Sequence, residues 1–158
     1  MFDNVGNNYN RSHNADSMSI LIVDDEPDIL SVIRRRLEEY GFNICSFAKP
    51  NLALEHYKAS SNNHRIVISD LRMPKMNGIE FLGKVKEINI NTKIFLMSCL
   101  DTDDLELLLF SSSPTQRLPS QHTKLMIDEF IEKPFSIEKL ILLLNKHLNE
   151  TKESIAVT

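Results

Sequence analysis

Five polar side chains stand at the ends of four apolar runs of the chain, and their types suit the binding of a phosphoryl group. They are Asp24, Asp25, Asp70, Ser98 and Lys133. Carboxylates that share a crevice repel one another unless a cation is present. Mg²⁺ relieves that repulsion by binding carboxylates together with phosphate oxygens, and an ammonium and a hydroxyl supply donors for the remaining oxygens. If these side chains meet, their site holds a phosphoryl group on or beside an aspartate.

Each of these residues has a simpler structural explanation when it is taken alone. An Asp pair that follows a strand often caps the next helix, and Asp70 lies shortly before a Pro-Lys-Met-Asn-Gly segment that is typical of a turn. A lone Ser98 says little, and Lys133 before Pro134 is compatible with an exposed strand end. The joint placement of all five at strand ends favours the functional interpretation, because chance seldom produces such a set.

The elements that must position these side chains alternate along the chain. Near-continuous apolar runs predict strands that are buried on both faces, over 19–23, 43–47, 65–69, 93–97 and 129–132. Amphipathic segments predict helices over 27–40, 50–60, 78–88, 101–110 and 136–148. This alternation implies an α/β fold, a doubly wound five-stranded parallel sheet with helices on both faces. Parallel strands bring their carboxyl ends to one edge of such a sheet, where α/β proteins bind ligands.

Three segments fall outside this alternation. Residues 1–17 are rich in Asn and Ser and predict a disordered N-terminal tail, after which Met18 is an alternative start. Residues 111–123 contain two prolines and predict a flexible insertion between the fourth helix and the fifth strand. Residues 150–158 predict a short polar C-terminal tail, so the expected domain covers 18–149.

Composition excludes several classes of protein. The 158 residues include 18 Lys and Arg against 22 Asp and Glu, and this net charge of -4 argues against a dedicated nucleic-acid binder. The sequence has no apolar run of about 18 residues and no signal peptide, so we expect a cytoplasmic protein without membrane insertion. With 4 glycines, it lacks the glycine-rich loops that cradle nucleotide phosphates. Cys45 and Cys99 lie in apolar runs and are expected to be small core residues.

The sequence around the polar side chains resembles the receiver domain of response regulators in two-component signalling. The resemblance rests on the runs ILIVDDEPD (20–28), VISDLRMPKMNGIEFL (67–82), FLMSC (95–99) and FIEKPF (130–135). It extends from Met18 to about Asn149, with 111–123 as the exception. It implies the flavodoxin-like strand order 2-1-3-4-5.

The resemblance also implies a role for each residue of the site. Asp70 matches the phosphoacceptor, which attacks a phosphohistidine of a partner kinase to form an acyl phosphate. Asp25 would bind Mg²⁺ (or Mn²⁺) directly, and Asp24 would help to position the ion. Asp70 itself and the backbone carbonyl of Arg72 would complete the protein ligands.

The remaining motif residues match positions that respond to phosphorylation. Lys133 would pair with a phosphoryl oxygen, and its bond to Pro134 would be cis. Ser98 would hydrogen-bond the phosphoryl group and move toward it, while Phe130 matches the aromatic switch whose ring turns inward. Phenylalanine lacks the hydroxyl of the more familiar tyrosine, so this switch would act by packing alone. The phosphoryl group would thereby shift the population of a bistable surface.

Two further positions, Arg72 and Leu100, tune the lifetime of the phosphoryl group in this family. We hypothesise that Arg72 reaches Glu26 across the mouth of the site and limits attack by water; the alternative is a solvated ion pair worth under about 1 kcal/mol. The segment 111–123 falls on the face that receivers use for dimerisation and output, which puts the standard output face in doubt. It is either a partner-docking loop or a disordered insertion.

We expect a stand-alone receiver that is phosphorylated by a sensor histidine kinase or a histidine phosphotransfer protein and signals through contacts with an unknown protein target. It would be a monomer or a weak phosphorylation-dependent dimer, and a phosphoacceptor rather than an enzyme. A phosphorelay intermediate is a close alternative. A pseudo-receiver, which is a constitutive binding module, would lack the Asp or Lys that are present here. An aspartate-nucleophile phosphatase would need a DxD where the chain has Asp70-Leu71-Arg72.

Overall fold

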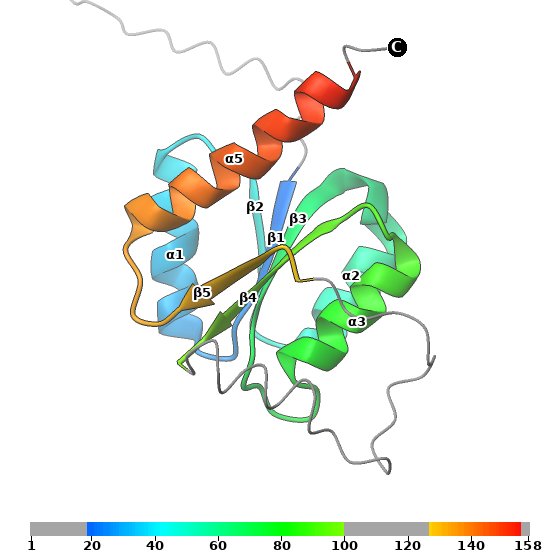
Figure 1. Cartoon of the computed structure of the whole chain (residues 1–158). Helices are drawn as coiled ribbons and strands as arrows, with labels where there is room; N and C mark the ends of the chain where they lie inside the picture. The colour runs from blue at the N-terminus through cyan, green and yellow to red at the C-terminus, as the bar shows by residue number, and fades with distance from the viewer. Residues whose placement is uncertain (1–18, 100–126, 156–158) are drawn as a thin grey trace, which may run out of the picture.

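A five-stranded parallel sheet forms the centre of the computed structural model, which describes residues 19–99 and 127–155. Its strands are β1 (Ser19–Val23), β2 (Ile44–Phe47), β3 (His64–Asp70), β4 (Lys93–Ser98) and β5 (Glu129–Glu132). The described helices are α1 (Pro27–Glu39), α2 (Pro50–Ser60), α3 (Gly78–Ile88) and α5 (Ile137–Ile155), with a short 3-10 turn η1 (Ser61–Asn63). The strand order is β2-β1-β3-β4-β5 (Figure 1), which confirms the predicted fold class.

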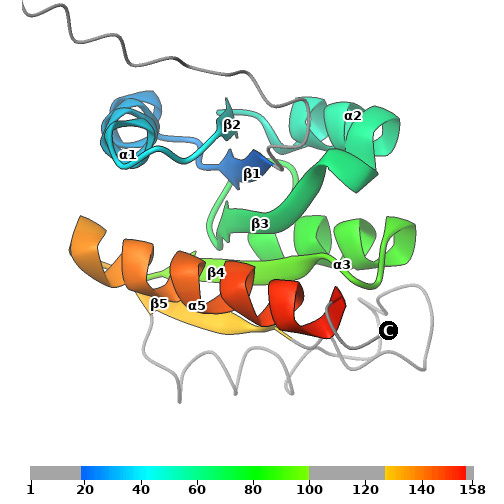
Figure 2. The ribbon, with the colours of Figure 1, turned by 90° about the horizontal axis from the view of Figure 1, so that it is seen from above.

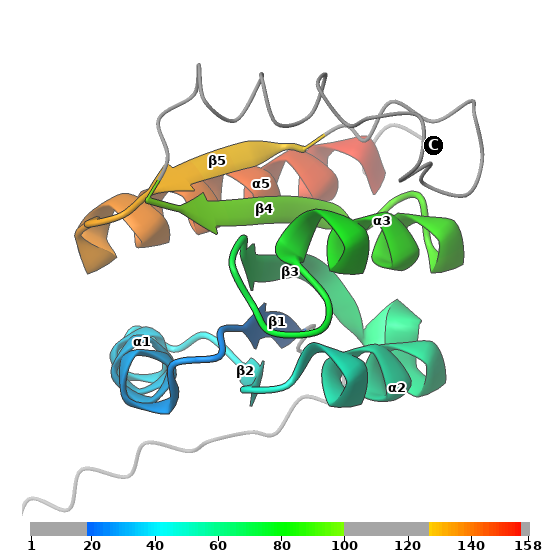
Figure 3. The same cartoon turned by 90° about the horizontal axis from the view of Figure 1, so that it is seen from below.

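Helices cover both faces of this sheet. Figures 2 and 3 show α1 and α5 on one face and α2 and α3 on the other. In β1, Ile20 and Ile22 belong to the core under α1 and α5, whereas Leu21 and Val23 belong to the core under α2 and α3. Every residue of β1 is therefore buried, which explains why the run is apolar without alternation.

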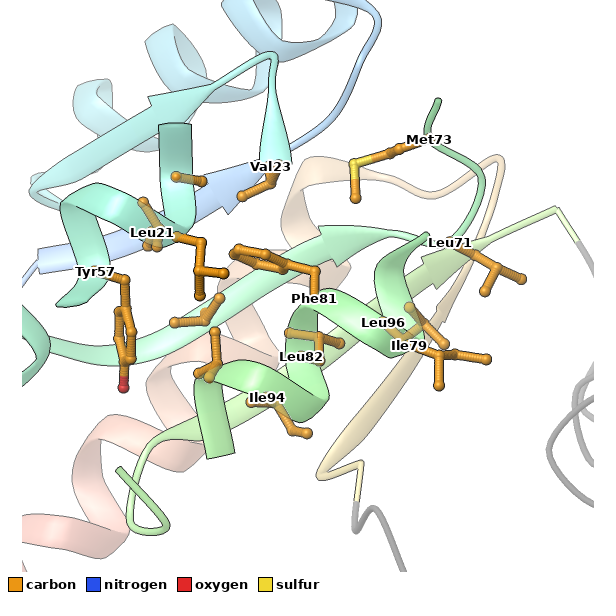
Figure 4. Packing of buried hydrophobic residues seen from close by; sticks show 14 residues of the cluster. Leu21, Val23, Tyr57, Leu71, Met73, Ile79, Phe81, Leu82, Ile94 and Leu96 are labelled. Carbon is orange, nitrogen blue, oxygen red and sulfur yellow. The ribbon is translucent and has the colours of Figure 1, made fainter. Parts of the chain in front are cut away.

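The core beneath α2 and α3 fixes the strands relative to those two helices (Figure 4). Tyr57 of α2 and Phe81 of α3 are fully buried in it, in one cluster with Leu96 of β4. Burial of a large apolar side chain stabilises a fold by roughly 1.5–3 kcal/mol. The Tyr57 hydroxyl lies 2.5 Å from Thr92 Oγ1, so its polar end is also satisfied. This packing keeps the carboxyl ends of the strands at one edge.

Local sequence features explain where the helices begin and end. Pro27 and Pro50 stand in the first turns of α1 and α2, where a missing N–H costs nothing. Gly41 has a φ of 88° just beyond α1, in the left-handed region that glycine adopts without strain. At the start of α5, Ser136 Oγ accepts a hydrogen bond of 3.2 Å from the N–H of Lys139.

Two predictions about local structure are wrong. Helix α5 continues to Ile155, past the end of the helix predicted over 136–148, because the Glu and Lys of this segment are good helix formers. Cys99 is exposed instead of buried, since it lies one residue beyond the end of β4. Cys45 is half-buried and packs against the core.

Several expected segments lie outside the described residues. They are the tail 1–17, Met18, Leu100, the helix 101–110 and the insertion 111–123. Within the parts that the structure describes, no helix combines the length and the apolar character needed to cross a bilayer.

Gly78 begins α3 directly against the end of β3, and we predict that a side chain there is costly. The Gly78 N–H donates to the Leu71 carbonyl at 2.9 Å, and a Cβ at Gly78 would overlap the carbonyl of Asp70. Gly78→Ala should therefore lower the free energy of unfolding by roughly 1–3 kcal/mol, because backbone has to shift. Gly83→Ala is the matched variant, because a Cβ at Gly83 of the same helix has no atom within 4 Å. This variant should raise the free energy of unfolding by roughly 0.5–1 kcal/mol.

Denaturant unfolding of both variants measures these changes. A Gly78→Ala variant as stable as the wild type would contradict the close approach of α3 to the end of β3.

Candidate functional site

The carboxyl ends of four strands bring the predicted site residues to one edge of the sheet. Asp70 and Ser98 are the last residues of β3 and β4, while Asp24 and Lys133 directly follow β1 and β5. Backbone hydrogen bonds hold these ends together. The Lys133 N–H donates to the Ser98 carbonyl at 2.7 Å, and the Leu71 N–H donates to the Met97 carbonyl at 2.8 Å.

The ammonium of Lys133 lies between two carboxylates at the centre of the site. Its Nζ is 2.6 Å from Asp70 Oδ1 and 3.0 Å from Asp24 Oδ2. Asp24 is fully buried and Asp70 is nearly so, while Lys133 is half-buried. The predicted cis bond between Lys133 and Pro134 is present. These ion pairs connect three separate strand ends.

The second oxygen of each carboxylate accepts a hydrogen bond from the backbone two residues further along the chain. Asp24 Oδ1 accepts from the Glu26 N–H at 2.9 Å, and Asp70 Oδ2 accepts from the Arg72 N–H at 3.1 Å. Such local bonds fix the direction of a carboxylate at the end of a strand. Both aspartates are therefore oriented before any ligand binds.

The surroundings shift the titration of the site residues. Burial raises the pKa of Asp70; Lys133 opposes this shift and the neighbouring Asp24 adds to it. For Lys133, burial alone would lower the pKa, but the hydrogen bonds and charges of Asp70 and Asp24 raise it above its ordinary value. The Lys133 ammonium therefore stays charged at neutral pH, and an ionised Asp70 is less favourable than it would be in water.

Three carboxylates at this edge form a group that fits a divalent cation. Asp24, Asp25 and Asp70 each offer an oxygen, and these oxygens all lie within 4.8 Å of one another. Asp25 is half-buried, so the group is reached from solvent on its side. In the described part of the chain, the ion pairs of these three carboxylates involve a single cation, the Lys133 ammonium. The group therefore carries an excess of negative charge. A set of hard oxygen donors with excess negative charge suits Mg²⁺ or a similar ion.

The other predicted site residues occupy different environments. Ser98 is buried at 3% exposure, whereas Phe130, on β5, is 37% exposed. Arg72 and Glu26 are both exposed, and the ion pairs found in residues 19–99 and 127–149 do not include one between them. The hypothesised Arg72–Glu26 contact is therefore not made in this structure, because solvent competes for two exposed charges. Leu100 lies outside the described residues.

Sequence reasoning missed two structural supports of the phosphoacceptor position. The N–H of Arg72 donates to Asp70, although only the carbonyl and the side chain of Arg72 were assigned roles from the sequence. Gly78 leaves room for the carbonyl of Asp70, and a glycine shortly after the Asp70 turn was the one available signal. The ion pairs by which Lys133 bridges Asp24 and Asp70 were also not predicted.

Comparisons with known proteins support the fold and indicate the family. The chain is 28% identical over 131 residues to the chemotaxis protein CheY of Bacillus subtilis, covering 82% of this chain and 97% of that protein. The receiver domain of the Francisella response regulator 1452 is 29% identical, with a TM-score of 0.66 and coverage of 84% and 98%. A response regulator receiver domain protein of Clostridium thermocellum is 24% identical with a TM-score of 0.69 over 85% and 96%, which supports the fold alone.

The chain also matches longer proteins and a family model. The chain spans about half or less of the length of several transcriptional regulatory proteins that it also matches. The family model described as "Response regulator receiver domain" matches residues 20–145, which include all four strand ends of the site. The chain therefore belongs to the response regulator receiver domain family.

Proposed function

We propose that Asp70 accepts a phosphoryl group from a histidine of a sensor kinase or of a histidine phosphotransfer protein. The observation that carries this proposal is the Lys133 ammonium, 2.6 Å from Asp70 and 3.0 Å from Asp24, beside a cluster of three carboxylates. A carboxylate held next to a fixed ammonium and a divalent-cation site is equipped to receive a charged phosphoryl group.

In the transfer, a carboxylate oxygen of Asp70 attacks phosphorus as the P–N bond of the phosphohistidine breaks. The leaving imidazole nitrogen keeps the bonding electron pair and takes up a proton. The product on Asp70 is an acyl phosphate, which water later hydrolyses to the free carboxylate and inorganic phosphate. The chain thus acts as a phosphoacceptor that is regenerated.

Asp24, Asp25 and Asp70, with the backbone carbonyl of Arg72, would hold Mg²⁺ or Mn²⁺. When bound, the ion supplies positive charge that offsets the charge of the phosphoryl oxygens. Lys133 supplies a second, permanent positive charge, because Asp70 and Asp24 keep its pKa high. Its position between the two carboxylates lets it pair with a phosphoryl oxygen once Asp70 is modified.

Ser98 and Phe130 connect the phosphoryl group to the surface of the protein. The buried Ser98, which ends β4, pairs across the sheet with Glu132 of β5, two residues from Phe130. A Ser98 hydroxyl drawn toward the phosphoryl group would free space into which the exposed Phe130 ring turns. That movement changes the surface presented to a downstream protein, so the output is a phosphorylation-dependent contact.

We predict that the chain gains one phosphate when it is incubated with Mg²⁺ and a small acyl phosphate. Asp70→Asn should gain none, because the amide is not a nucleophile for this transfer. Asp28→Asn is the matched control, since Asp28 is an exposed aspartate in the first turn of α1 and should leave the gain unchanged. Intact-mass measurement records the outcome.

Absence of any gain in the wild type would overturn the proposal and favour a constitutive binding module. A gain that persists in Asp70→Asn would place the modification on another residue.

We also predict that Asp70→Asn is more stable than the wild type at neutral pH. The pKa of Asp70 is raised by burial, so the wild type loses folding free energy as the pH rises from the ordinary value of 3.8 through the pKa of the folded state, above which the full cost of ionisation is present. The stability advantage of the variant should shrink as the pH falls and vanish below the ordinary value of 3.8, where Asp70 is protonated in both states. Thermal unfolding across this pH range measures the difference.

Asp28→Asn is again the control, and it should lose a small amount of stability at neutral pH because it removes a charge from a helix N-terminus. An Asp70→Asn variant less stable than the wild type at neutral pH would show that the ion pair with Lys133 outweighs the cost of burial.

A further inference from the structure

Ser69, which directly precedes Asp70 in β3, is a polar side chain in an apolar part of the sheet. It is fully buried, and its register partners, Val23 of β1 and Leu96 of β4, both belong to the core under α2 and α3. A hydroxyl in such surroundings costs folding free energy unless it makes a hydrogen bond. The hydrogen bond that Ser69 makes therefore indicates its role.

The hydroxyl of Ser69 bonds to the backbone of the phosphoacceptor position. It donates to the Asp70 carbonyl at 2.9 Å. Asp70 lies one residue beyond Ser69, which forms the last pair of β1 and β3, so the ladder between these strands has already ended there. The N–H of the same peptide, which belongs to Leu71, donates to the Met97 carbonyl at 2.8 Å. Both polar groups of the peptide between Asp70 and Leu71 are thus held, one by Ser69 and one by β4.

The next peptide of the chain is held in the same way. The Leu71 carbonyl accepts from the Gly78 N–H at 2.9 Å, and the Arg72 N–H donates to Asp70 Oδ2 at 3.1 Å. Two successive peptides therefore fix the turn that leaves Asp70, and one of their bonds ends on the carboxylate itself. Three of the four donors are backbone N–H groups, which nearly every residue type supplies. The Ser69 hydroxyl is the one donor that depends on the choice of side chain.

We propose that Ser69 is a positioning residue for phosphoryl transfer to Asp70, an inference that rests on the proposed function. Its hydroxyl prevents rotation of the peptide that follows Asp70, and so fixes the direction in which the Asp70 side chain leaves the backbone. That direction keeps Asp70 Oδ1 at 2.6 Å from Lys133 Nζ. Transfer requires the attacking oxygen to lie within about 3–3.5 Å of phosphorus and in line with the bond that breaks, so a small rotation slows it.

The rate of phosphate gain by the full chain tests this role. The chain is incubated with saturating Mg²⁺ and increasing concentrations of a small acyl phosphate, and intact mass records the initial rates. Ser69→Ala should lower the limiting rate by roughly three- to tenfold, as expected for the loss of one hydrogen bond. The half-saturating donor concentration should stay within about twofold of the wild-type value, because Lys133 and the carboxylates that bind the cation are unchanged.

Two further variants separate positioning from stability. Ser69→Cys preserves the volume of the side chain but offers only a weak S–H donor, so it should slow the transfer as Ser69→Ala does. Ser19→Ala is the matched control, since Ser19 is also a buried serine whose hydroxyl donates to a backbone carbonyl, that of Asn63 at 3.2 Å, but at the other end of the sheet. It should lower the unfolding temperature and leave the limiting rate unchanged. Thermal unfolding followed by circular dichroism establishes that each variant is folded.

Two results would overturn this inference alone. If Ser69→Ala and Ser69→Cys are phosphorylated at the limiting rate of the wild type, the hydroxyl serves only to satisfy the Asp70 carbonyl. If Ser19→Ala slows the transfer as much as Ser69→Ala does, the loss comes from a general loosening of the sheet. A wild type that gains no phosphate would overturn the proposed function as well, so the two failures are distinguishable.

Discussion

The contact on which the site depends is the Lys133 ammonium between the carboxylates of Asp24 and Asp70. These two aspartates are buried, and buried charges of one sign destabilise a fold unless each is paired and hydrogen-bonded. Lys133 offsets both charges, and the N–H groups of Glu26 and Arg72 satisfy the remaining oxygens. The ends of three strands, far apart in the chain, are thereby held in register at one edge of the sheet. Excess negative charge remains, and it suits a divalent cation.

The sheet itself separates two kinds of chemistry along a single strand. Strand β3 starts at His64, beside nitrogen and sulfur donors, and ends at Asp70, among oxygen donors. Helices on both faces bury the strand between these ends, so each end is the place where polar side chains can gather. The hydrogen-bonded group at the first end, which consists of Cys45, His56 and His64, connects α2 to β2 and β3. We propose that the second end changes its contacts when Asp70 is phosphorylated.

Much of the fold could be predicted because the apolar runs are continuous and each ends in a polar residue. A short, continuous apolar run has few interpretations other than a strand that is buried on both faces. The placement of Asp70 and Lys133 at one edge then follows from the parallel arrangement of the strands. The exposed position of Cys99 was missed, because its apolar neighbours suggested burial although the predicted strand already ended before it. The group around His56 and His64 was also missed, since its members are separated in sequence and meet only through the packing of α2 on the sheet.

Calorimetric titration of the metal-free chain with Mg²⁺ tests the charge balance of the site most directly. The arrangement predicts one Mg²⁺ per chain in the wild type, loss of that binding in Asp25→Asn, and tighter binding in Lys133→Met, where the ammonium no longer offsets the carboxylates. Asp28→Asn should bind Mg²⁺ as the wild type does, because Asp28 lies outside the cluster. Equal Mg²⁺ affinity in Asp25→Asn and the wild type would contradict the account.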